Sequence, residues 1–82
     1  EPTIRIYPNP TQNKLYVRVR SKNEVRAVIF SSTGVEIVSK NLIGNGEMKE
    51  GEFDLLSFTP GIYNITIVDG YKQSVKKIAK VN

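Results

Sequence analysis

Histidine and cysteine, two side chains that serve in many catalytic and metal sites, are absent from this chain. Its 82 residues contain no His and no Cys, so neither a Ser–His nor a Cys–His nucleophile can form. The same absence excludes a zinc site built from imidazole and thiolate ligands. We therefore expect that the chain is not an enzyme and that it holds no cofactor.

Carboxylates are the remaining candidates for acid–base or metal chemistry. Glu50, Glu52 and Asp54 alternate along the sequence, and alternate side chains of a strand point to the same face. Such a row of oxygen atoms suits a hard cation such as calcium. The segment lacks the loop spacing of a calcium motif, so we expect a solvated strand face and no metal.

Basic residues give the chain a net charge of +4 and gather in two groups. The groups are Arg18, Arg20, Lys22 and Arg26, and Lys72, Lys76, Lys77 and Lys80. Tyr16 has the same strand parity as Arg18, and interleaved aromatic and basic residues are typical of single-stranded nucleic-acid sites. Lys and Arg on strand edges also discourage aggregation. We favour that explanation and expect no nucleic-acid partner.

The elements that position these side chains are strands, because apolar and polar residues alternate with period two. Turn residues such as Gly, Pro, Asn and Asp separate the runs at short spacing. The predicted strands are residues 3–7, 14–20, 24–30, 35–41, 47–54, 61–68 and 71–81. We therefore predict an all-β fold, a seven-stranded antiparallel immunoglobulin-like β-sandwich. No apolar stretch approaches the roughly 18 residues of a membrane span, and we expect none.

Two local motifs refine this fold. Asp69-Gly70 is a pair in which both residues tolerate positive φ, so it predicts a tight hairpin between the last two strands. The segment from Leu55 to Tyr63 contains a Pro-Gly corner before a strand that begins with Tyr. This pattern resembles the tyrosine corner of β-sandwiches, in which the Tyr hydroxyl bonds to nearby backbone.

Four short motifs occur in order along the chain. The first is Ile6-Tyr7-Pro8-Asn9-Pro10-Thr11, followed by Leu15-Tyr16-Val17. The second is Val28-Ile29-Phe30 leading to Gly34, the third joins Asp54-Leu55 to Pro60-Gly61-Ile62-Tyr63, and the last is Lys77-Ile78-Ala79-Lys80-Val81. Together they resemble the type A C-terminal sorting domains of the type IX secretion system. We expect a mainly structural role for Tyr7, Pro8, Asn9, Pro10, Gly34, Pro60, Gly61 and Tyr63.

The resemblance implies a role as ligand and substrate. Residues 1–82 would be a single C-terminal sorting domain, a piece of a larger exported protein. Such cargo enters the periplasm through an upstream signal peptide and ends at the cell surface or outside the cell. An outer-membrane translocon or a shuttle protein recognises the folded domain. In many cargos a sortase-like enzyme then removes the domain and links the cargo to anionic lipopolysaccharide.

The last predicted strand is the surface that we expect the export machinery to recognise. A strand at a sheet edge offers unpaired N–H and C=O groups to a partner, and lysines add attraction to an acidic receptor. The recognition residues proposed on this basis are Lys76, Lys77, Ile78, Lys80 and Val81. Val75, Ile78, Ala79 and Val81 are also expected to close the core. A homodimer formed by edge pairing is a further expectation.

Two other functions remain open. The chain would be a surface adhesion or carbohydrate-binding sandwich if its aromatic residues formed an exposed platform. The candidates for that platform are Tyr7, Tyr16, Phe53, Phe58 and Tyr71. It would be a retained envelope domain if it signalled by binding another protein through the same edge and basic residues.

Overall fold

Alternating apolar and polar residues form seven strands in the computed structural model, which describes residues 3–82. The strands are β1 (Ile4–Tyr7), β2 (Lys14–Arg20), β3 (Val25–Ser31), β4 (Glu36–Asn41), β5 (Met48–Asp54), β6 (Gly61–Asp69) and β7 (Lys72–Lys80). Among the described residues there is no helix. The predicted all-β class and the existence of all seven strands are confirmed, with small differences at the strand ends.

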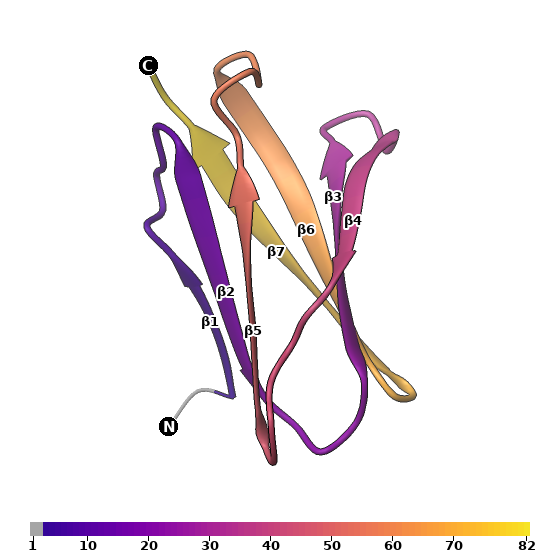
Figure 1. The fold of residues 1–82 in the computed structure, drawn as a ribbon. Coiled ribbons are helices and arrows are strands. Elements are labelled where there is room, and N and C mark those ends of the chain that lie inside the picture. Colours follow the sequence, from indigo (N-terminus) through magenta and orange to yellow (C-terminus); the bar gives the residue numbers. More distant parts are fainter. Residues whose placement is uncertain (1–2) are drawn as a thin grey trace.

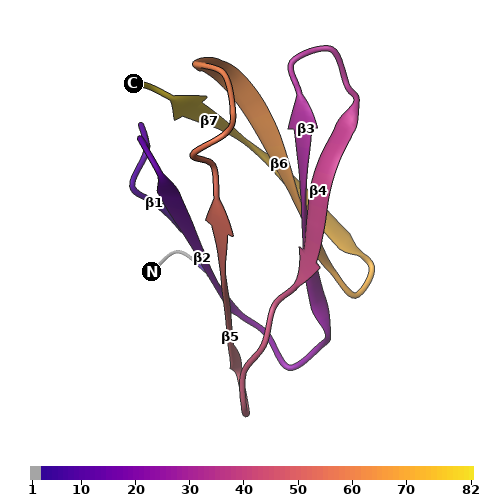
Figure 2. The same cartoon turned by 45° about the horizontal axis from the view of Figure 1, so that its top comes forward.

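Two antiparallel sheets pack against each other (Figure 1). One sheet has the order β1-β2-β5 and the other has the order β4-β3-β6-β7. Figure 2 shows the same two layers from a second direction, with the β6–β7 hairpin on the side away from β1. This arrangement is consistent with the predicted immunoglobulin-like sandwich.

The core lies between the sheets and follows the predicted alternation. Leu15, Val17 and Val19 of β2 are buried on one face. They pack in one cluster with apolar side chains from the other sheet, including those of Ile29 and Ile65. Burial of these branched side chains, at about 25 cal/mol per Å² of apolar surface, is the main force that holds the sheets together.

The chain crosses between the sheets after β4. Ile43 pairs with Glu50 of β5, while the N–H of Leu42 donates to Val25 in β3. Gly51 leaves room for the Leu42 side chain here, because a Cβ atom at Gly51 would lie 2.6 Å from Cδ2 of Leu42. The residues that follow β4 therefore cover the side of the core beside β5.

The β6–β7 hairpin forms where it was predicted, but its turn is shifted by one residue. Asp69 pairs with Lys72, so the two loop residues are Gly70 and Tyr71. Gly70 alone of these has a positive φ, +62°, which matches a type II′ turn. The prediction that Asp69 takes such a conformation is wrong. Its carboxylate instead accepts hydrogen bonds from Ser21, at 2.5 Å, and from the Asn23 side chain.

The predicted tyrosine corner is present at the start of β6. The Tyr63 hydroxyl donates to the Thr59 carbonyl at 2.6 Å and also contacts the Thr59 hydroxyl. The Tyr63 ring is buried and packs at 5.2 Å from the Phe58 ring. The corner fixes the loop that leads from one sheet to the other.

Candidate functional site

Strand β7 lies at the edge of the four-stranded sheet, as predicted. It pairs along its length with β6, from Asp69↔Lys72 to Gly61↔Lys80. Its other edge faces away from the sheet, so the main-chain groups on that side need other partners.

The loop after β1 covers the C-terminal half of this outer edge. The Asn9 side chain donates to the Lys77 carbonyl and accepts from the Ala79 N–H, both at 3.0 Å. Thr11 donates its N–H to Ala79 and accepts from the N–H of Val81, both at 2.9 Å. We call this contact of Asn9 and Thr11 with residues 77–81 the clasp. It closes half of the edge with bonds inside the chain.

The N-terminal half of the same edge is open. Both main-chain groups of Ala79 point to the clasp, and the β6–β7 register has no shift. The main-chain N–H and C=O groups of every second residue in a strand point to the same side. Those of Gln73 and Val75, and the N–H of Lys77, therefore also point away from β6. Among residues 3–82 these groups have no hydrogen-bond partner. The open edge, defined as Gln73 to Lys77, can therefore pair with another strand.

The structure divides the five predicted recognition residues. Lys76 and Lys77 are exposed, whereas Ile78 is 1% exposed and belongs to the core. Lys80 is only 6% exposed, and its ammonium donates to the Val81 carbonyl at 3.1 Å. The N–H of Val81 is held by the clasp. Of the five residues, Lys76, Lys77 and Val81 thus have exposed side chains, and only the two lysines also carry a charge that a partner can meet.

The prediction that Val75, Ile78, Ala79 and Val81 all close the core is wrong for two of them. Ile78 is buried, but Val75 is 63% exposed and Val81 is 39% exposed. The reason is strand parity, because Ile78 lies on the inward face and the odd-numbered residues lie on the outward face. Val75 therefore adds an exposed apolar side chain to the open edge.

A hollow lies beside the open edge, where β7 approaches β1. It has a volume of about 260 Å³ and is lined by Ile4, Ile6, Asn9, Lys76 and Lys77. Within the described part of the chain no ion pair engages either lysine. The hollow thus combines two partly buried isoleucines with two cations that lack a counterion.

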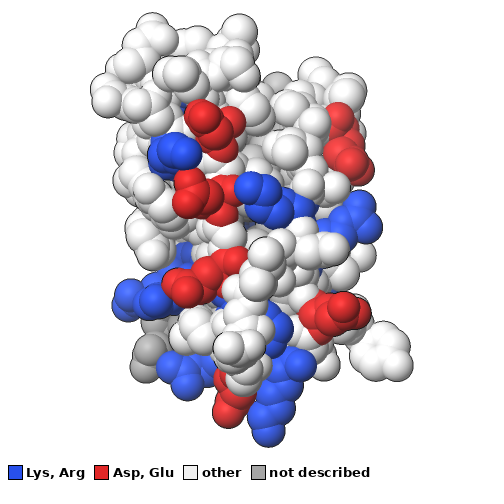
Figure 3. Space-filling model, in the orientation of Figure 1, with Lys and Arg blue, Asp and Glu red and all other residues white. Residues whose placement is uncertain are grey.

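The outer face of the β1-β2-β5 sheet is different, because its charges neutralise one another. Arg18 pairs with Glu50 at 2.9 Å, and Lys14 pairs with Glu52 at 3.0 Å. The hydrogen bond to Glu52 raises the pKa of Lys14 above its ordinary value. Figure 3 shows basic and acidic side chains interleaved on the viewed face. The predicted common face of the β5 carboxylates is confirmed, and these two are held in cross-strand ion pairs.

The predicted aromatic candidates do not form one platform. Tyr7 and Tyr16 are exposed and stack on each other, with ring centroids 5.7 Å apart and planes at 27°. Phe53 is buried, Phe58 packs on the tyrosine corner, and Tyr71 is fully exposed at the tip of the β6–β7 hairpin. Only the Tyr7–Tyr16 pair therefore offers adjacent rings on one face.

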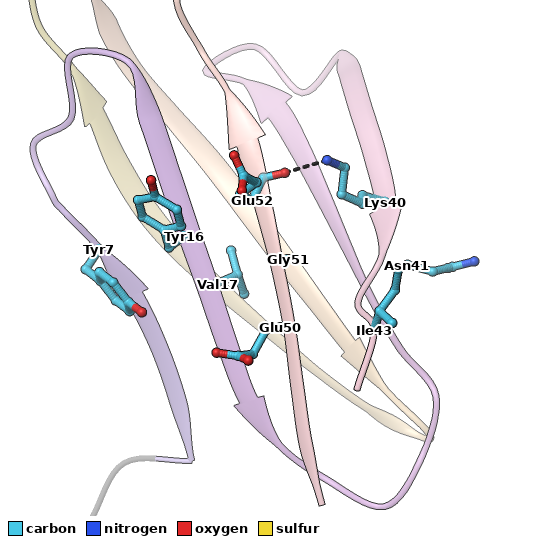
Figure 4. A pocket seen from close by; sticks show the side chains of 9 residues that line it. All are labelled: Tyr7, Tyr16, Val17, Lys40, Asn41, Ile43, Glu50, Gly51 and Glu52. Carbon is cyan, nitrogen blue, oxygen red and sulfur yellow. Dashed lines mark hydrogen bonds between the residues drawn. The ribbon is translucent and has the colours of Figure 1, made fainter. Parts of the chain in front are cut away.

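A shallow hollow of about 520 Å³ adjoins this tyrosine pair (Figure 4). Its lining includes Ile43, Glu50 and Glu52. On its far side Lys40 donates to the Glu52 main-chain carbonyl and lies 5.4 Å from the Phe53 ring centroid. Lys40 had no signal in the sequence, because its neighbours depend on the crossing of the chain after β4.

The clasp was also missed from the sequence. The sequence predicts a mainly structural role for Pro8, Asn9 and Pro10, but it indicates no partner for the Asn9 side chain. The bond from Asn9 to Lys77 joins residues that are 68 positions apart. No local pattern indicates this contact, because the prolines constrain the backbone but do not specify the partner of the Asn9 side chain.

Comparison with models of protein families finds one family over nearly the whole chain. Residues 5–81 match the model of the secretion system C-terminal sorting domain. A search of curated proteins finds no match. No helix within residues 3–82 has the length and apolar character needed to cross a membrane.

Proposed function

The chain belongs to the secretion system C-terminal sorting domain family, and from this premise we propose that it is recognised as a folded export address in type IX secretion. The observation that carries the proposal is the extent of the family match, which runs from β1 past the end of β7. A match of this extent includes the clasp, the core and the open edge. The sorting signal is then the folded domain as a whole.

Export across the outer membrane, to the cell surface or the medium, follows from this assignment. We propose that the cargo first passes through the periplasm and that the translocon or a shuttle protein binds the domain there. We also propose that a sortase-like enzyme removes the domain after export. In these steps the domain is bound and cleaved by other proteins.

Within the domain we propose that β7 is the part the machinery contacts. Lys76 and Lys77 are exposed and attract an acidic receptor surface. Ile78, Lys80 and Val81 contribute by anchoring the strand, since each is buried or bound to neighbouring groups. The motif residues from Tyr7 to Pro10 form the loop that clasps this strand, and those from Pro60 to Tyr63 shape the loop that leads into its neighbour β6.

The test is export of a reporter protein in a bacterium that has type IX secretion. The reporter carries a periplasmic signal peptide at its N-terminus and residues 1–82 at its C-terminus. We expect the reporter at the surface or in the medium of the normal strain, and in the periplasm of a strain without the translocon. A reporter that remains in the periplasm of the normal strain, with the domain folded, contradicts the proposal.

The mass of the exported reporter tests removal of the domain. Loss of about 9 kDa, the mass of residues 1–82, is the expected result if a sortase-like enzyme acts. A reporter that reaches the surface with the domain attached identifies a retained envelope domain instead. Deletion of the last five residues is a poor test, because it removes the core residue Ile78 and the clasped Val81.

A second candidate function rests on the Tyr7–Tyr16 pair. Exposed aromatic rings beside carboxylates can bind a carbohydrate, since the rings pack on the sugar and the carboxylate oxygens accept hydrogen bonds from its hydroxyl groups. Titration of the domain with oligosaccharides, followed by NMR, tests this. Shifts confined to the residues around Tyr16 that disappear in Tyr16→Ala support it, and an unchanged spectrum rejects it.

A further inference from the structure

We propose that the open edge, Gln73 to Lys77, pairs with an extended acidic segment of the export machinery, which adds a strand to the β4-β3-β6-β7 sheet. This inference rests on the proposed function and specifies how the address is recognised. It places the main contact in the N-terminal half of β7, ahead of the terminal motif Lys77 to Val81.

The main-chain geometry carries the first step. The N–H and C=O groups of Gln73 and Val75 and the N–H of Lys77 point away from β6 without partners in the described chain. They follow one another at the spacing of a strand, and an added strand satisfies them in the way that peptides bind to sheet edges elsewhere. The clasp occupies the next groups, at Lys77 and Ala79. It therefore sets the end of the region in which the new strand pairs.

The side chains beside the edge indicate what the added strand carries. On the outward face Val75 is 63% exposed, so it favours an apolar neighbour. On the other side the hollow places Lys76 near Ile4 and Ile6. The strand β7 contains Lys72, Lys76, Lys77 and Lys80 and no acidic residue. A partner strand that alternates apolar residues with Asp or Glu complements both faces.

The same charges argue against a second copy of this chain as the occupant. Two β7 strands brought edge to edge would place lysines from both copies along one seam. Neither strand has a carboxylate to offset them, and like charges on neighbouring strands are destabilising. An acidic segment removes this cost and gains attraction during the approach.

The decisive variant is Val75→Pro. The N–H of Val75 points away from β6. The substitution therefore removes a hydrogen-bond donor of the open edge but breaks no hydrogen bond between β6 and β7. Proline is tolerated in edge strands at such positions. Val75→Ala is the matched control, because it trims the side chain and keeps the donor. Circular dichroism and thermal melting establish that both variants are folded.

The binding probe is a synthetic peptide that alternates Val and Glu, titrated into the isotope-labelled domain. We expect shifts of the amide signals of Gln73, Val75 and Lys77. Val75→Ala loses only the apolar side-chain contact, whereas Val75→Pro also loses the donor, so we expect Val75→Pro to bind about tenfold more weakly than Val75→Ala. Lys77→Glu should also weaken binding about tenfold, whereas Lys22→Glu, in the exposed β2–β3 loop, should change it little. Equal affinity of all variants, or shifts elsewhere on the surface, overturns the inference. If Val75→Pro fails to fold, the lysine pair of variants decides the question.

Export of the reporter separates this inference from the proposed function. We expect the Val75→Pro fusion to remain in the periplasm while the Val75→Ala fusion is exported. If both are exported like the unaltered fusion, the open edge is not the contact and the proposed function stands. If the unaltered fusion is not exported, the proposed function fails. The peptide titration then tests by itself whether the open edge binds an acidic strand. A dimer in sedimentation that Val75→Pro converts to monomer identifies a second copy as the occupant and also overturns the inference.

Discussion

Removal of the Asn9 side chain tests how much the clasp contributes to stability. Asn9→Ala removes two hydrogen bonds, one to the Lys77 carbonyl and one from the Ala79 N–H. A typical net value of about 0.5–1.5 kcal/mol for each bond gives a loss of about 1–3 kcal/mol. Because both backbone groups gain access to water in the variant, we expect the lower part of this range, about 1–2 kcal/mol. In a domain of this size each kcal/mol lowers Tm by about 4–8 °C.

Urea unfolding measures the free energy, and amide hydrogen exchange shows where the loss occurs. The Ala79 amide should lose protection, while the Val81 amide, which is bound to Thr11, should keep more of it. Gln12→Ala is the matched control, since its side chain donates to the Asn82 carbonyl outside β7. An Asn9→Ala variant with the stability of the Gln12→Ala variant and unchanged Ala79 exchange would refute the reasoning.

Three further predictions concern other parts of the fold. Ile78→Ala should cost about 2–4 kcal/mol in urea unfolding because it leaves a cavity in the core, whereas Val75→Ala should stay within about 0.5 kcal/mol because Val75 is exposed; equal losses would contradict the orientation of β7. Tyr63→Phe should cost about 1–2 kcal/mol, since it leaves the Thr59 carbonyl without its donor, and a Tm equal to that of the unaltered chain would reject the corner as a stabilising contact. The hydroxyl of Ser21 and then the amide of Asn23 hold the pKa of Asp69 below its ordinary value of 3.8, so the unfolded chain binds this proton more readily. The stabilisation is therefore present above pH 3.8 and is lost as the pH falls through the lower folded-state value; melting of Asp69→Asn at a series of pH values should lack this component, and an acid transition identical to that of the unaltered chain would exclude it.

The sequence predicted the strands well because each depends on a local pattern. Alternation in β2 places Leu15, Val17 and Val19 in the core with no knowledge of their partners. The same logic failed in β7, where apolar residues occur on both parities and the pattern alone does not say which side faces inward. The structure decides for Ile78 because the opposite sheet covers that face.

The remaining features depend on contacts between distant parts of the chain. The clasp joins Asn9 to Ala79, 70 positions away, and Lys40 meets Glu52 only because the chain crosses between sheets. Neither has a periodic signature in the sequence. The turn at Gly70 was misplaced for a similar reason, because Asp69 is drawn into the strand by hydrogen bonds from Ser21 and Asn23. Side-chain bonding of this kind outweighs the local preference of an Asp-Gly pair.

The two halves of the β7 edge are protected from unwanted strand pairing in different ways. An open edge is a template for unwanted pairing, and proteins protect such edges with covering loops or with charge. The clasp covers residues 77–81 and keeps that half closed to any partner. Along residues 73–77 the protection comes from Lys76 and Lys77, which repel a like-charged edge but attract an acidic one. On our proposal, charge therefore disfavours self-pairing and still admits an acidic partner strand, whereas a second clasp would exclude both. If the secretion machinery binds the domain through this edge, as we propose, the domain needs protection from self-pairing and access for its partner at the same time, and β7 combines the two within one strand.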